Sequence, residues 1–146
     1  PDGSSRRVAE GLAFPNGMAI LADGKTLVCA ESFNGNLTAF DIGEDGSLSN
    51  RRLWANVGQY GNDGICADAE GAIWTSTGPT VLRIRDGGEI VEKFELDRMC
   101  FAVMLGGRDG RTLYMVANEW TGSVDISSPT GRVFSTRVAV PHAGYP

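Results

Sequence analysis

The chain has 146 residues, with 13 Lys and Arg, 18 Asp and Glu and one His, and a formal net charge of −5 at pH 7. This acidic balance excludes a nucleic-acid partner that depends on a basic face, because few cations are present to neutralise phosphates. Apolar residues make up 42% of the chain, and no apolar run approaches the roughly 20 residues of a spanning helix. We therefore expect one packed domain without a membrane partner.

Three stretches of the chain share one pattern. An apolar strand, an acidic-Gly turn and a second strand follow one another at 16–30, 63–76 and 101–117. The turn glycines are Gly24, Gly71 and Gly110. A glycine after an acidic residue between two strand-like runs indicates a hairpin, since glycine tolerates a positive φ angle.

Two further strand-like segments follow each of these stretches, at 36–41 and 48–54, 80–85 and 89–96, and 123–126 and 132–138. Four strands in a period of roughly 40 to 50 residues are typical of β-propeller blades. The sequence therefore predicts an all-β chain that supplies about three four-stranded blades, at 14–60, 61–98 and 99–140, with a tail at 141–146. Residues 1–13 are expected to be a remnant of a preceding blade, with Arg6–Leu12 as its outer strand.

Three blades are too few to close a ring, because propellers have four to eight. An open part-ring would expose two apolar blade faces and an unpaired sheet edge. We expect the ring to be completed by a missing N-terminal half, by another chain or by copies of this chain.

Two candidate ligands precede the innermost strands. Asn16 in the segment 14–17 and Asp63 in the segment 61–64 occupy the same repeat position, whereas the third repeat has an apolar residue there, near Phe101. Loops that enter the innermost strands open on one face of the channel, so Asn16 and Asp63 should converge. Amide and carboxylate oxygens suit a hard cation such as Ca²⁺, Mg²⁺ or Mn²⁺. The alternative is that Asn-Gly and Asp-Gly are only turn residues.

The other reactive residues give weaker indications of a functional site. Cys29, Cys66 and Cys100 are odd in number and lack metal-site spacing, which favours buried free thiols in a reducing compartment and hence a cytoplasmic protein. His142 would have to serve any Ser-His-Asp triad, and a chain end is a poor place for a general base. Glu31–Ser32 and 118–120 either border the channel or are exposed loop residues.

The motifs together resemble the SMP-30/gluconolactonase/luciferin-regenerating-enzyme family. The resemblance rests on 14–19 (FPNGMA), 46–52 (GSLSNRR), 62–74 (NDGICADAEGAIW), 105–107 (LGG), 111–114 (RTLY) and the tail 140–146 (VPHAGYP). It implies a six-bladed propeller with one divalent metal on its axis, of which this chain is the C-terminal half. Asn16 and Asp63 match two family metal ligands, and a third, a Glu, is expected in the absent N-terminal half. Asn62 replaces the Pro that commonly precedes the Asp.

The resemblance also implies a function. It predicts a metal-dependent hydrolase that opens sugar lactones or similar cyclic esters, with Asp63 as metal ligand and general base and Asn16 as a neutral ligand. Ca²⁺ is the first choice of metal, with Zn²⁺, Mg²⁺ or Mn²⁺ as alternatives. Its partners would be the lactone and the N-terminal half of the propeller. The alternative is a non-catalytic calcium-binding or protein-interaction propeller.

Overall fold

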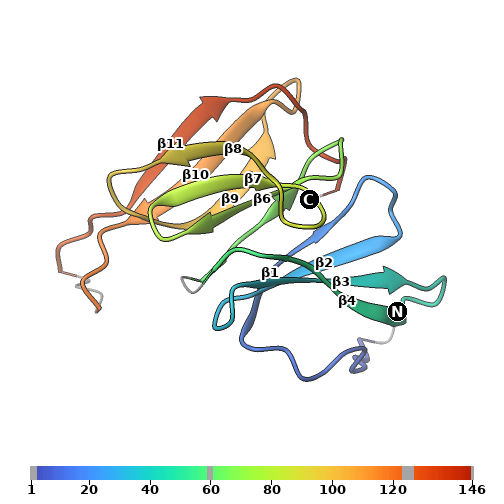
Figure 1. Cartoon of the computed structure of the whole chain (residues 1–146). Helices are drawn as coiled ribbons and strands as arrows, with labels where there is room; N and C mark the ends of the chain where they lie inside the picture. The colour runs from blue at the N-terminus through green and yellow to red at the C-terminus, as the bar shows by residue number, and fades with distance from the viewer. Residues whose placement is uncertain (1–2, 59–60, 123–126, 146) are drawn as a thin grey trace.

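A computed structural model of the chain describes residues 3–58, 61–122 and 127–145, which form strands, turns and loops without a helix. Within these ranges, no helix is both long and apolar enough to cross a membrane. The strands form three antiparallel sheets in chain order (Figure 1). The first contains β1 (Pro15–Ile20), β2 (Thr26–Glu31), β3 (Asn36–Ile42) and β4 (Leu48–Asn56). The second contains β5 (Cys66–Ala67), β6 (Ile73–Thr77), β7 (Thr80–Ile84) and β8 (Ile90–Glu95), and the third contains β9 (Met99–Gly106), β10 (Thr112–Asn118) and β11 (Arg132–Arg137).

Each sheet is a blade whose strands follow one another from the inside outward, as the repeat pattern predicts. The turn glycines Gly24, Gly71 and Gly110 have φ angles of 67°, 77° and 72°, which explains why glycine occurs at all three hairpins. One apolar core joins the first blade to the second through residues that include Trp54 and Ile73. Another core joins the second blade to the third, and it includes Trp74 and Leu113. The chain is thus three stacked blades of a β-propeller.

Two further glycines hold neighbouring blades together at their innermost strands. The Gly17 amide donates to the Asp63 carbonyl at 3.1 Å, and the Gly64 amide donates to the Phe101 carbonyl at 2.8 Å. A Cβ atom on Gly17 would lie 2.4 Å from the Asp63 carbonyl oxygen, and one on Gly64 would lie 2.5 Å from Cβ of Ala102. Close approach of the next blade, and not a turn conformation, requires glycine at these two positions.

The outermost strand of the third blade differs from the expectation. Residues 132–138 are predicted as a fourth strand, but β11 pairs directly with β10 and takes the third place in the sheet. The Thr130 hydroxyl bonds to the Asn118 side chain and closes the connection between the two strands, so that β11 begins beside the end of β10. The predicted strand at 123–126 lies outside the described residues.

The predicted outer strand at Arg6–Leu12 is also corrected, because these residues form no strand. The Arg51 guanidinium instead donates to the carbonyl oxygens of Glu10 at 3.1 Å and Gly11 at 3.0 Å. Arg6 donates to the backbone of Asp45 at 2.5 Å. Side-chain donors therefore take the place of a strand ladder and fasten this segment along the first blade.

Candidate functional site

The structure brings Asn16 and Asp63 together. Asn16 is the second residue of β1, and Asp63 lies in the segment that leads into β5. The inter-blade hydrogen bond from Gly17 to Asp63 fixes their backbones side by side, and the Asn16 side chain lies near enough to the Asp63 carboxyl to lower its pKa. Both residues lie where the innermost strands of their blades begin.

The surroundings of Asp63 are only partly exposed to water. Burial raises the pKa of the Asp63 carboxyl and the neighbouring Asn16 amide lowers it, with a net rise above the usual range. The thiol of Cys100 has a raised pKa, chiefly through burial and partly through the nearby Asp63 charge. Phe101, at the equivalent place in the third blade, offers a backbone carbonyl but no ligating side chain.

Asn62 positions the segment that carries Asp63. Its side chain is fully buried, and its Nδ2 donates to the Asn36 carbonyl at 2.7 Å. The hydroxyl of Ser32 donates to the Asn62 carbonyl at 2.8 Å. The Oδ1 atom of the Asn62 side chain is buried without a hydrogen-bond partner among the described residues. In the sequence Asn62 stands out only as a departure from the family pattern, so this positioning role was not predicted.

The donor set fits a hard divalent cation. Asp63 offers carboxylate oxygens and Asn16 an amide oxygen, which Ca²⁺ and Mg²⁺ prefer to nitrogen or sulfur. Residues 3–58, 61–122 and 127–145 contain no group of three or more His, Cys, Asp or Glu that could hold a metal. A cation held here would therefore need further oxygen ligands in addition to the Asn16 amide and the Asp63 carboxylate.

Glu31 neither borders the channel nor lies exposed in a loop, because it is 1% exposed. It accepts hydrogen bonds from the Ala13 amide at 2.6 Å, the Asn34 side chain at 3.1 Å and the Thr38 hydroxyl, and Arg51 lies 3.6 Å away. Burial raises its pKa, but these bonds more than offset that effect and hold the pKa below its usual range. Glu31 thus fixes the chain just before β1 and is a positioning residue for Asn16.

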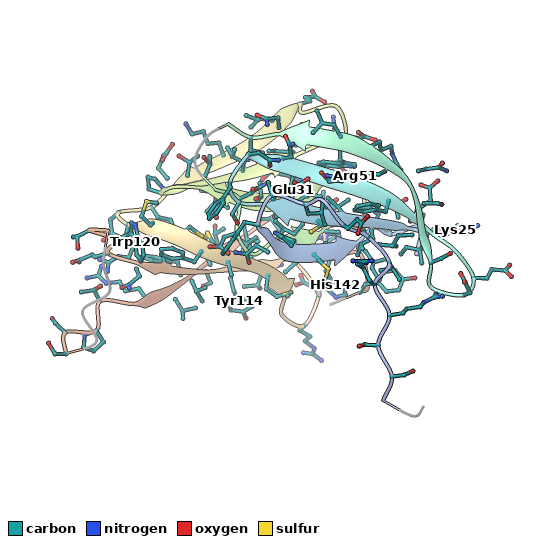
Figure 2. All side chains as sticks on the ribbon, turned by 90° about the horizontal axis from the view of Figure 1, so that it is seen from below. Lys25, Glu31, Arg51, Tyr114, Trp120 and His142 are labelled. Carbon is teal, nitrogen blue, oxygen red and sulfur yellow. The ribbon has the colours of Figure 1, made fainter. Side chains whose placement is uncertain are left out.

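His142 belongs to the packing of the tail. Its amide donates to the Gly110 carbonyl at 3.0 Å, and its backbone forms a bridge with Asp68. The ring Nδ1 accepts the Gly144 amide at 2.9 Å, so it has no proton to donate to a carboxylate, as a triad histidine must. In Figure 2, His142 and Trp120 lie well apart.

The three cysteines are buried and free, as their number and spacing predict. None of them faces a partner cysteine in a disulfide. The Cys29 thiol has a raised pKa, through burial and the nearby Glu31 charge. Cys66 and Cys100 belong to the core between the second and third blades, whereas Cys29 is buried outside both cores. Burial raises the pKa of all three thiols and so disfavours the thiolate, which is the nucleophilic form.

Solved structures share this fold. A gluconolactonase from Xanthomonas campestris is 25% identical, with a TM-score of 0.73, and the match covers 100% of this chain and 42% of that one. A luciferin-regenerating enzyme is 22% identical, with a TM-score of 0.75 and coverages of 90% and 47%. Regucalcin from Agrobacterium tumefaciens, a calcium-binding protein, is 19% identical, with a TM-score of 0.79 and coverages of 96% and 51%. The chain spans about half the length of these proteins.

The family assignment comes from the sequence match. The model of the SMP-30/Gluconolactonase/LRE-like region matches residues 1–119, which is most of the chain and includes both Asn16 and Asp63. The predicted resemblance is confirmed, and the predicted fold agrees with the sheets and with the propellers that match them. The chain belongs to the SMP-30/gluconolactonase/LRE-like family.

Proposed function

We propose that this chain is the C-terminal half of a metal-dependent hydrolase that opens lactones. The observation that carries the proposal is the contact between the Asn16 amide and the half-buried Asp63 carboxylate where the innermost strands begin. The likeness to a gluconolactonase and to a calcium-binding protein of the same fold supports it. The N-terminal half of the ring would supply the remaining ligand, a glutamate, and the rest of the pocket.

The proposed hydrolysis uses two side chains of this chain, Asn16 and Asp63. A divalent cation, with Ca²⁺ as first choice and Zn²⁺, Mg²⁺ or Mn²⁺ as alternatives, supplies the Lewis acidity that polarises a carbonyl and stabilises charge on its oxygen. Asn16 and Asp63 would hold it. Asp63 accepts a proton from the water that attacks the carbonyl carbon. The ring C–O bond then breaks, and the proton passes from Asp63 to the departing alkoxide oxygen.

Asn16 contributes by being neutral. A second carboxylate at its position would repel Asp63 and lower the net positive charge available to the substrate carbonyl. The neutral amide instead favours the charged form of Asp63, since it lowers the pKa of that carboxyl. Glu31 and Asn62 support this arrangement through the backbone of Ala13 and through the segment before β5.

The test is Asp63→Asn in the complete protein, with acid release from glucono-δ-lactone as the assay. We expect turnover to fall by about 10²-fold or more, the range for loss of a general base, while metal affinity falls less. Treatment with a chelator should abolish activity, and adding back single metals should restore it. Asp86→Asn, at an exposed turn, is the matched control. Near-full activity of Asp63→Asn would refute the assigned role.

A non-catalytic calcium-binding propeller is the second candidate. The likeness to regucalcin, a calcium-binding protein, favours it. Under this alternative, calorimetry would detect calcium binding that depends on Asp63, but no lactone would be hydrolysed with any of the metals.

The three buried thiols favour a reducing compartment, and we infer a cytoplasmic location from them. Fractionation of cells that produce the complete protein, followed by detection with an antibody, tests this location directly.

A further inference from the structure

Two aromatic pairs lie on the blades on either side of the one that carries Asp63. In the first blade, the rings of Phe14 and Phe33 stack with centroids 4.4 Å apart. In the third blade, Phe101 and Trp120 meet edge to face at 5.9 Å. Three of these side chains are widely exposed, Phe14 at 53%, Phe33 at 75% and Trp120 at 48%. The other tryptophans inside the blades, Trp54 and Trp74, are by contrast buried in the cores.

Backbone contacts connect both pairs to the candidate site. The Ser32 amide donates to the Phe14 carbonyl at 3.0 Å, and the Ser32 hydroxyl reaches the segment of Asp63 at Asn62. On the other side, Phe101 accepts the Gly64 amide that follows Asp63. Trp120 lies at the end of the molecule opposite Lys25, beyond the end of β10 (Figure 2). The exposed aromatic surfaces are therefore on the end of the blades where Asn16 and Asp63 are found.

The conformation of Phe14 is unusual for a bulky residue. Its φ angle is +60°, a region that large side chains rarely adopt. The strained backbone holds the ring against Phe33, two residues before Asn16. Strain of this kind persists where the surrounding structure maintains it, and it is commonest at binding sites.

A pocket beside Trp120 is large enough for a small ligand. Its volume is about 440 Å³, within the usual range for ligand sites, and Pro79, Leu96, Met99 and Trp120 form its apolar wall. Arg98 also lines it but pairs with Asp97 at 2.9 Å and Glu119 at 3.6 Å, while Arg132 pairs with Asp97 at 3.1 Å. Because these charges compensate one another, the pocket favours a neutral, apolar group over an ion.

We propose that the pocket at Trp120 binds an apolar substituent of the substrate, so that the preferred substrates are lactones with an alkyl or aromatic group and not fully hydroxylated sugar lactones. This inference rests on the proposed lactone hydrolysis. It assigns Trp120 as a residue that determines substrate specificity, with Phe14 and Phe33 as the apolar border on the other side of Asp63.

The experiment compares glucono-δ-lactone with δ-decalactone in the complete protein. For the native protein we expect a higher kcat/KM with δ-decalactone. Trp120→Ala should lower that value by about tenfold or more, mainly through KM, and should change the value for glucono-δ-lactone by less than twofold. Trp120→Phe should retain most of the activity, and Tyr145→Ala, which removes an exposed aromatic from the tail, is the matched control.

Binding is measured separately in Asp63→Asn, by calorimetry with δ-decalactone. We expect saturable binding that Trp120→Ala weakens at least fivefold. If δ-decalactone binds at Trp120 but the native protein hydrolyses no lactone, the proposed function and the substrate preference fail, and only the assignment of Trp120 as a binding residue for an apolar group stands. If glucono-δ-lactone is preferred, or if Trp120→Ala lowers the melting temperature and affects both lactones equally, Trp120 only packs the ring and the inference is overturned.

Discussion

The buried carboxylates of Asp68 and Glu31 bind backbone and side-chain donors around them. Asp63, which is only partly buried, is the carboxylate of the candidate site. Asp68 is fully buried and accepts the Arg83 guanidinium at 2.6 Å and the amides of Glu70 and Ala72 at 2.9 and 3.1 Å. Glu31 similarly collects the bonds that fix the chain before β1. Removing such an acceptor leaves several buried donors unpaired, which costs more than one hydrogen bond is worth.

We predict that Glu31→Gln lowers the free energy of unfolding by about 1–3 kcal/mol at pH 7, because a neutral amide replaces a charged acceptor. The pKa of Glu31 lies below its usual range in the folded protein. Its contribution is therefore complete above the ordinary pKa of glutamate and is lost as the pH falls through the lowered folded value. Urea denaturation between pH 7 and pH 3 should show a steeper loss for the native protein than for the variant.

Glu44→Gln, at an exposed turn, serves as the control and should follow the native protein at every pH. Parallel curves for Glu31→Gln and the native protein would contradict the role given to this carboxylate.

The sequence allowed prediction of Asn16 and Asp63, but not of Glu31 or Asn62. The first two share a repeat position, and repeat-equivalent residues of neighbouring blades must lie close together. Glu31 is the last residue of β2, just before a turn, and it is buried because the segment before β1 returns over it. That return depends on contacts between residues distant in the chain, which no local pattern contains.

At the scale of elements, local sequence patterns predicted the hairpins but not every pair of neighbouring strands. Each glycine turn lies between two strands that pair, since the turn itself fixes the pairing. The segment that forms β11 was recognised as a strand, yet its place in the sheet depends on a long connection after β10. Strand formation is local, whereas the choice of sheet edge is not.

We predict that Gly17→Ala destabilises the complete protein by about 2 kcal/mol or more, because the added methyl would overlap the backbone of Asp63. The same displacement would separate Asn16 from Asp63, so lactone hydrolysis should fall as well. Thermal unfolding and the acid-release assay measure the two effects.

Gly131→Ala is the matched control for this substitution. No atom lies within 4 Å of a Cβ at Gly131, and its φ angle is not in the left-handed region. It should be neutral or slightly stabilising. Equal effects of the two substitutions would mean that the approach of β1 to the second blade is not tight.

At the scale of the whole molecule, the two end blades each present an apolar face. In the third blade, Tyr114 lies opposite Met104 across β9 and β10, and the two are 41% and 45% exposed. In the first blade, Met18 and Leu53 are 62% and 61% exposed. The predicted blade count implied such faces, and coverage of only 42–51% of the matching propellers agrees with it. What covers them could not be predicted, because the contacts lie outside this chain.

We predict that the face at Tyr114 is buried in the complete protein, against the next blade of the ring. Tyr114→Glu would then place an unpaired charge in an apolar contact and lower the free energy of unfolding by about 3 kcal/mol or more. Tyr145→Glu, at a similarly exposed residue of the tail, should cost little, because its charge stays in water. Chemical denaturation of both variants decides the matter: if Tyr114→Glu is as mild as Tyr145→Glu, this face is free surface and the ring is not completed across it. A large difference would mean that the exposed residues of β10, which alternate with buried ones along the strand, pack against the next blade.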